Sequence, residues 1–101
     1  MPRSIVGESV AASQTAQTLG PTGAVGDCLY GVLVIPATTS PGAVAILDGA
    51  TSTTIFTGGA SSVSNLVPFF IPFPLGIRSS SGAWSVTTGA NVSVIACGRF
   101  T

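Results

Sequence analysis

Hydrophobic and polar residues alternate along most of this chain with a period of two, over short stretches rich in Val, Ile, Thr and aromatic residues. Clusters of Gly, Pro, Ser and Asp separate these stretches. The pattern predicts β-strands, because successive side chains of a strand point to opposite faces of a sheet. The expected strands are Asp27–Pro36, Ala43–Leu47, Thr53–Thr57, Val67–Phe73, Ala83–Thr87 and Asn91–Gly98, with shorter ones near Ile5 and Ile77. No stretch has helical periodicity.

Seven or eight short strands in a chain of 101 residues favour two packed antiparallel sheets. We therefore expect an all-β fold, an antiparallel β-sandwich that is jelly-roll-like. An immunoglobulin-like sandwich is the second choice, since the Cys and Trp spacing of true immunoglobulin domains is missing. Asp48-Gly49 suits a tight turn, which predicts a hairpin that places Val44 and Ile46 opposite Ile55 and Phe56.

The segment Leu66–Leu75 carries three prolines at positions of one parity, Pro68, Pro72 and Pro74. In an extended strand these prolines remove backbone donors from a single edge, so the segment can pair with a sheet on one side only. Phe69, Ile71 and Phe73 would share the core face. Phe70 would lie on the proline face, where either a partner protein or a loop of its own chain covers it.

Residues 1–25 have few large apolar side chains apart from Ile5, Val6, Val10 and Leu19. Such a segment cannot bury enough surface to offset its ordering entropy, about 1–2 kcal/mol per residue, without contacts from elsewhere. We therefore expect an extended N-terminal arm over residues 1–25, held by a neighbouring subunit or a scaffold protein. Residues 26–101 would form a single β-sandwich domain.

The chain carries three basic and three acidic residues, no histidine and zero net charge. A monomer with so little charge lacks the repulsion that keeps soluble proteins apart, which favours burial in an oligomer or on a scaffold. Three scattered arginines do not favour nucleic acid as a partner. No apolar run is long enough to span a membrane, and the first twenty residues lack the apolar stretch of a secretion signal, so we expect synthesis in a cytoplasm.

The composition also limits the chemistry that can be built. Without histidine or lysine, Ser-His-Asp, Cys-His and lysine-based catalysis are excluded, and we expect no enzyme activity and no cofactor or metal. The three carboxylates lie in different segments, with Asp48 expected in a turn and Asp27 at a solvated strand start. Cys28 and Cys97 are expected to be buried thiols, with a disulfide as the alternative. Trp84 is expected in the core, and a surface contact is its alternative.

The chain also resembles a known group of proteins, and two stretches carry this resemblance, VGDCLYGVLVIPATTSPGAVAILDG and FTGGASSVSNLVPFFIPFPLGIRSSSGAWSVTTGANVSVIACGRF. Over roughly residues 25–100, in its style of strand and loop, it resembles the small virion structural proteins of tailed bacteriophages. Within that group it is most similar to capsid decoration, or cement, proteins. The resemblance implies a homotrimer, or a dimer, bound to the major capsid protein on the exterior of the virion.

Two other functions stay open at this point. A receptor- or carbohydrate-binding module of a fibre or tail tip would use Trp84 and the Ser-rich loops, and another head–tail structural component would use similar surfaces. For capsid attachment we expect the arm to reach across shell subunits and the proline face to line a contact. The candidate interface residues are Arg3, Ile5, Val6, Val10, Leu19, Pro68, Phe70, Pro72 and Pro74.

Overall fold

The computed structural model describes residues 5–101, which form eight strands and no helix. No helix that could cross a membrane is therefore found in this range. The strands are β1 (Val6–Val10), β2 (Gln17–Thr18), β3 (Cys28–Pro36), β4 (Val44–Asp48), β5 (Thr51–Phe56), β6 (Phe69–Arg78), β7 (Trp84–Thr88) and β8 (Val92–Arg99).

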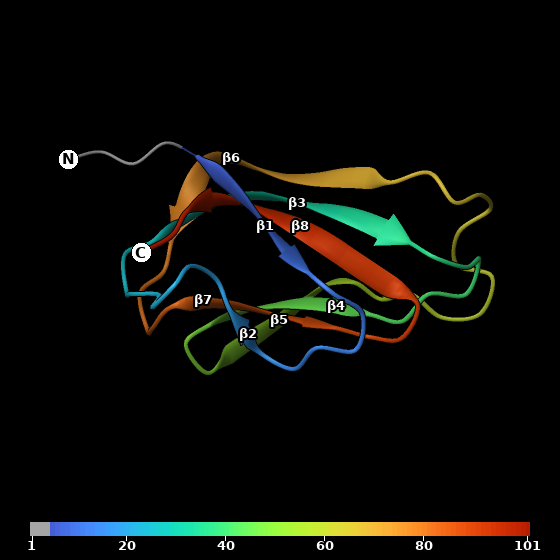
Figure 1. Cartoon of the computed structure of the whole chain (residues 1–101), viewed down its shortest axis with the longest axis horizontal. Helices are drawn as coiled ribbons and strands as arrows, with labels where there is room; N and C mark the ends of the chain where they lie inside the picture. Colours follow the sequence, from blue (N-terminus) through green and yellow to red (C-terminus); the bar gives the residue numbers. More distant parts are fainter. Residues whose placement is uncertain (1–4) are drawn as a thin grey trace.

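The strands make two four-stranded antiparallel sheets that lie one above the other (Figure 1). We call them sheet A, with the order β1-β8-β3-β6, and sheet B, with the order β2-β7-β4-β5. β1 pairs with β8, β2 with β7, β3 with β6 and β4 with β5, so the chain forms one long antiparallel ribbon. Further pairing of β3 with β8 and of β4 with β7 rolls this ribbon into two sheets. This is the jelly-roll arrangement, and the predicted fold class is confirmed.

The predicted strands appear within a few residues of their expected bounds, and the differences are informative. The two-residue turn of the β4–β5 hairpin is Gly49-Ala50, one position later than expected, and Gly49 has a φ of 61°. A positive φ at this first turn position favours glycine. Val44 faces Phe56 as predicted, but Ile46 faces Thr53, because the register shifts next to Val44. The strand expected near Ile77 is the second half of β6.

Of the segment predicted as an arm, residues 1–4 lie outside the described residues, and the part from Ile5 on belongs to the sandwich. β1 pairs with β8 along its whole length and β2 pairs with β7. Val10 and Leu19 are fully buried in the core, and the hydroxyl of buried Thr88 donates to the carbonyl of Ala11 at 2.6 Å. Composition suggested a weakly held segment because its large apolar residues are few. Two of them, however, sit where both sheets close over them.

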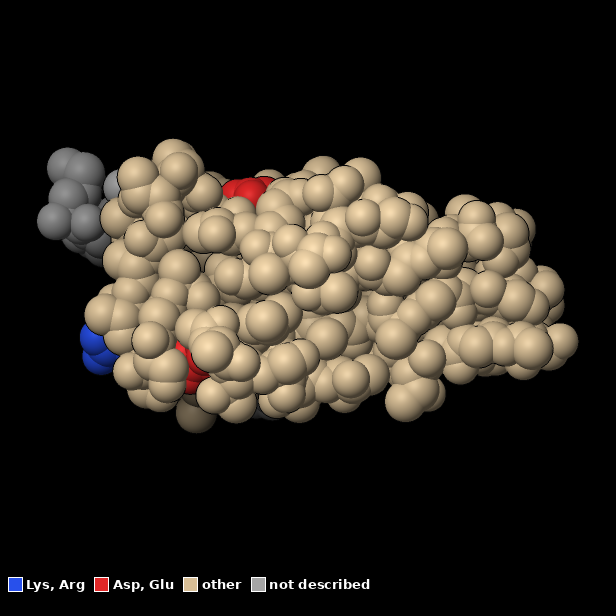
Figure 2. Space-filling model, turned by 90° about the horizontal axis from the view of Figure 1, so that it is seen from below, with Lys and Arg blue, Asp and Glu red and all other residues tan. Residues whose placement is uncertain are grey.

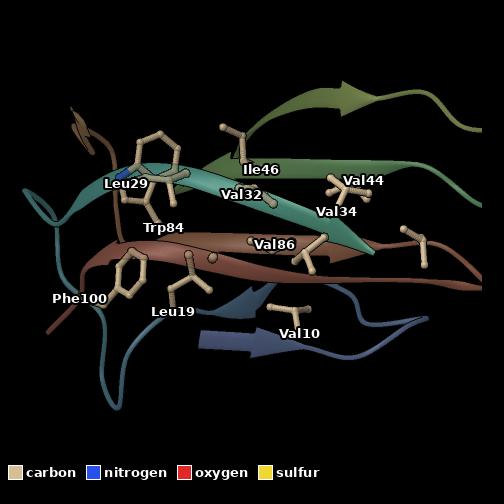
Figure 3. Packing of buried hydrophobic residues seen from close by; sticks show 13 residues of the cluster. Val10, Leu19, Leu29, Val32, Val34, Val44, Ile46, Trp84, Val86 and Phe100 are labelled. Carbon is tan, nitrogen blue, oxygen red and sulfur yellow. The ribbon is translucent and has the colours of Figure 1, made fainter. Parts of the chain in front are cut away.

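The core lies between the sheets and consists mainly of valines that alternate with outward residues along each strand (Figure 3). Val32 and Val34 of β3 and Val94 of β8 face Val44 of β4 and Val86 of β7 across this layer. Phe69, Ile71 and Phe73 pack against its edge, as their shared parity predicted. The buried members are Val10, Leu19, Leu29, Val32, Val34, Val44, Ile46, Trp84, Val86, Val92, Val94, Ala96 and Phe100.

Two leucines of β3 offer a matched test of this architecture, since Leu29 is fully buried and Leu33 faces outward and is half-buried. We expect Leu29→Ala to lower the free energy of unfolding by about 2–5 kcal/mol, because it leaves a cavity between the sheets. Leu33→Ala should cost much less, since water already reaches that side chain. Urea unfolding measures both. Equal losses would contradict the assignment of the two faces.

Candidate functional site

The two sheets present different chemistry on their outward faces. Strand parity directs Leu33, Ile35, Phe70, Ile95 and Cys97 outward from sheet A, and their exposure is intermediate or greater. With Pro72 these residues form what we call the apolar face. The outward face of sheet B, which we call the hydroxyl face, contains Ala45 and Leu47 among serines and threonines. Those hydroxyl residues are Thr18, Ser52, Thr54, Ser85 and Thr87.

Charged side chains are sparse on both sides of the sandwich. Seen from below, on the side of sheet B, acidic and basic atoms form only isolated spots (Figure 2). On the apolar face, Arg78 of β6 and Arg99 of β8 are both register partners of Cys28 in β3. Both arginines therefore lie at one end of sheet A. The other described residues of that face are uncharged.

The exposed large apolar residues follow the two edges of sheet A. Seven of the eight in the described chain lie on or directly before β1 or β6, and the eighth is Val25. Those seven are Ile5, Val6, Leu66, Val67, Phe70, Leu75 and Ile77. Scattered apolar side chains are normal on a protein surface, but a concentration along one sheet indicates an interaction surface.

The Phe70 ring lies over Gly31 of the neighbouring strand β3. A Cβ atom at Gly31 of β3 would overlap the Phe70 ring, so the glycine provides the space in which the ring sits. The side chain nevertheless stays 49% exposed. Its own chain therefore covers about half of it, which leaves the outer half available to a partner.

Leu75 occupies the most unusual position on the surface. β6 bulges between Pro72, which pairs with Gly31, and Ile77, which pairs with Leu29. In this bulge Leu75 is 98% exposed and has a φ of 67°. The left-handed conformation costs a leucine about 1–2 kcal/mol. The exposed side chain makes no packing contact that would offset this cost. Strain of this kind concentrates at functional sites.

The Tyr30 ring packs against the bulge at Gly76. A Cβ atom at Gly76 would lie 3.0 Å from the Tyr30 ring, and the Arg99 guanidinium carbon lies 5.9 Å from the centre of the same ring. The ring thus contacts the bulge and also lies near a cation, an interaction that is itself attractive. Leu75 consequently projects from a fixed base.

A shallow depression of about 650 Å³ lies beside β1, between its last residues and β8. It is lined by Ser9, Val10, Ala11, Ala12, Gln14, Gln17, Ile35, Ser93, Val94 and Ile95. Ile35 and Ile95 also belong to the apolar face, so this face ends in a hollow rather than a flat surface.

The residues predicted for an interface separate into three groups. Val10 and Leu19 are completely buried, so the prediction was wrong for them. Ile5, Val6 and Phe70 are about half exposed, and Pro68 and Pro72 are exposed. Arg3 and the side chain of Pro74 lie outside the described residues. Sequence reasoning missed Leu75, Leu66 and Val67, and only the Gly that follows Leu75 hinted at a break in the strand.

Asp27 is not the solvated strand start that was predicted. It is 7% exposed, and its carboxylate accepts hydrogen bonds from the backbone N–H of Ala24 at 3.1 Å and of Thr101 at 2.9 Å. Its backbone carbonyl accepts from Ser79 N–H and from the Trp84 indole N–H. These contacts join loops from both ends of the chain, which gives Asp27 a structural role.

The other carboxylates also bind backbone groups. Glu8 accepts from Gly20 N–H at 2.6 Å. Asp48 accepts from Ser81 N–H at 2.9 Å and from Ser80 N–H at 3.0 Å. Within the described range no group of three His, Cys, Asp or Glu side chains is placed to hold a metal ion.

The structure decides whether Trp84 lies in the core or on the surface, and whether the two cysteines form a disulfide. Trp84 is 5% exposed and its indole N–H donates to the carbonyls of Asp27 and Ile77, which confirms the core placement. Cys28 and Cys97 are free thiols, without the alternative disulfide. They are half-buried rather than fully buried, because strand parity directs both to the outward side of sheet A.

Asp48 generates a pH prediction. The backbone N–H of Ser81 is the main reason that the pKa of Asp48 lies below its ordinary value, and Ser80 adds to the effect. A lowered folded-state pKa stabilises the fold above the unfolded value, near pH 4, and this contribution is lost as pH falls through the lowered pKa. Asp48→Asn should therefore lower the melting temperature at pH 7.

The deficit should shrink progressively as the buffer is brought from pH 5 toward pH 2, because both proteins then carry an uncharged group at position 48. Thermal unfolding followed by circular dichroism across this range measures it. A deficit that stays constant over the whole range would show that the Asp48 charge contributes nothing.

Comparison of the chain with protein-family models, with curated proteins and with solved structures gives no match. Its function is therefore inferred from the surface described above.

Proposed function

We propose that this chain is a non-enzymatic virion structural protein that binds an assembled bacteriophage capsid and stabilises it from outside. The observation that carries the proposal is the difference between the two outward faces, together with the exposed Phe70 and Leu75 on β6 at the edge of sheet A. The apolar face would contact the major capsid protein. The hydroxyl face would remain in solvent.

The energetics of attachment suit this surface. Stable protein interfaces bury about 800 Å² on each partner, and apolar area contributes about 25 cal/mol per Å² before the costs of association. Phe70 and Leu75 would be the central contacts, since well-packed large side chains dominate binding. Both are already held in place, Phe70 by Gly31 and the bulge of Leu75 by Tyr30. The Phe70 ring would then lose little side-chain entropy on binding, whereas for Leu75 only the backbone is fixed in advance.

Stabilisation of the shell follows from linkage. A protein that binds only the assembled shell shifts the equilibrium toward that shell, by an amount that grows with its concentration relative to its dissociation constant. Many copies on one shell multiply a modest contribution per site. This role needs no catalytic group, which fits a chain whose carboxylates bind backbone N–H groups.

The carbohydrate-binding alternative is weakened by the burial of Trp84, since that ring would have supplied its stacking surface. The hydroxyl of the neighbouring Ser80 is also occupied, because it donates to the Asp48 carboxylate. Another structural position in the same virion would use the same apolar face. Binding to isolated capsids separates that role from decoration of the shell.

Leu75→Asn tests the proposal with little risk to the fold, because asparagine tolerates positive φ better than leucine and the leucine makes no buried contact. We expect an unchanged or higher melting temperature and a dissociation constant about tenfold weaker for purified empty capsids of the same virus. Co-sedimentation with those capsids over a concentration series measures the affinity.

Leu47→Asn is the matched control, since it makes the same chemical change on the hydroxyl face. It should bind capsids like the unmodified protein, provided that circular dichroism shows it folded. The proposal fails if the unmodified protein does not bind at a saturable ratio. A contact through the apolar face fails if both variants bind with unchanged affinity.

A further inference from the structure

The four edge strands of the sandwich differ in how well they are protected against pairing with another chain. An edge strand exposes unpaired backbone N–H and C=O groups, and proteins commonly block it with proline, charge, a bulge or a covering side chain. β1, β2, β5 and β6 are the four edges, since each pairs with one neighbour only. Three of them are blocked.

β6 carries Pro72 and Pro74 and the bulge around Leu75. β1 contains Glu8, and the backbone carbonyl of Ser9 accepts a hydrogen bond from the Gln17 side chain at 3.2 Å. β2 is only two residues long. Each of these strands is therefore a poor template for further pairing.

Of these features β5 has only a bulge at Ile55, where its register with β4 shifts, and residues 51–54 precede that bulge. The strand is six residues long, its sequence is TSTTIF, and it contains neither proline nor charge. Its first four residues, 51–54, are all exposed. Threonine and isoleucine also favour the extended conformation, so the strand needs no reorganisation to accept a partner.

The turn defines which backbone groups are free. Asp48 and Thr51 flank the two-residue turn, and in such hairpins the flanking pair exchanges main-chain hydrogen bonds. Thr51 and Thr53 then bond toward β4. Ser52 and Thr54 direct their N–H and C=O groups away from the sheet.

An apolar seam lies beside this open edge. Ile46, Ile55, Phe73 and Ile77 line a depression of about 320 Å³ between β5 and β6, together with Thr51, Thr53, Asp48 and Trp84. Ile77 is 44% exposed there. A strand added next to β5 would extend sheet B and shield this seam from water.

We propose that β5 is a homodimerisation edge, at which a second copy of this chain adds its own β5 in the antiparallel direction. A two-fold axis through Thr53 would place Ser52 of each copy opposite Thr54 of the other, so that their free backbone groups bond to one another. Thr53 would meet its counterpart, and threonine pairs of this kind stabilise adjoining strands. Sheet B becomes one continuous sheet through both copies.

A second copy fits this edge better than an unrelated strand. The contact is isologous, so the same surface must be complementary to itself. An uncharged strand meets this condition, because it places no like charges opposite each other. The zero net charge of the chain adds no long-range repulsion between copies. Pairing at β5 does not use the apolar face, so it is independent of capsid binding, and it favours the dimer among the oligomers that the sequence suggested.

Three variants test the edge. Thr54→Pro removes an outward N–H but leaves the bonds of Thr53 to β4, and Thr54→Lys leaves the backbone intact while placing a charge on the edge. Ser85→Lys adds the same charge to the same outward face on β7, which is an inner strand. Light scattering over about a hundredfold dilution series follows the mass, because dimerisation depends on concentration.

The unmodified protein and Ser85→Lys should approach twice the 9.9 kDa mass of one chain at high concentration, and both Thr54 variants should stay near 9.9 kDa. Circular dichroism verifies that each variant is folded. A monomer or trimer in the unmodified protein overturns the proposal, as does a dimer that persists in Thr54→Lys.

Amide hydrogen exchange locates the contact. Protection of the Ser52 and Thr54 amides should rise with protein concentration, whereas the Thr53 amide should be protected at every concentration, since it bonds to β4. Concentration-dependent protection on β1 or β6 without any on β5 would place the dimer elsewhere and overturn the proposal. Leu75→Asn should remain dimeric, which separates this result from a failure of capsid binding.

Discussion

The burial of Asp27 holds together the end of the sandwich at which β3 begins. A carboxylate taken out of water is costly unless hydrogen bonds replace the lost hydration. Asp27 obtains these bonds from Ala24 and Thr101, while its backbone carbonyl accepts the indole N–H of Trp84. Because β3 belongs to sheet A and Trp84 begins β7 of sheet B, the same residue couples the two sheets and two distant segments of the chain.

Once the sheets are coupled, strand parity decides what the molecule shows to its surroundings. Each inward valine of β3 and β8 implies an outward neighbour, and on sheet A those neighbours include Leu33, Ile35 and Ile95. The outward positions of sheet B are mainly serine and threonine. A stable core alone would allow polar residues on the outward faces of both sheets. The apolar side chains on the outward face of sheet A therefore indicate contact with another molecule.

The edges show the same division between stability and interaction. In β6 the prolines and the bulge prevent strand addition, yet the bulge holds Leu75 in a strained and exposed conformation. In β5 the side chains are unremarkable and the free backbone is the notable feature. The β6 edge thus presents an exposed side chain, and the β5 edge presents unpaired backbone groups. The two proposed contacts therefore use different edges of the sandwich.

The alternation of apolar and polar residues in the sequence determined the all-β class, most strand positions and the one-sided pairing of β6, because period-two patterning and proline parity are local properties. The absence of histidine and lysine limited the chemistry in the same direct way. The sequence did not reveal that Val10 and Leu19 are core residues, that Asp27 is buried or that Leu75 projects from a bulge. Those features depend on which distant strands lie side by side, and only the rolling of the ribbon into two sheets brings such residues together.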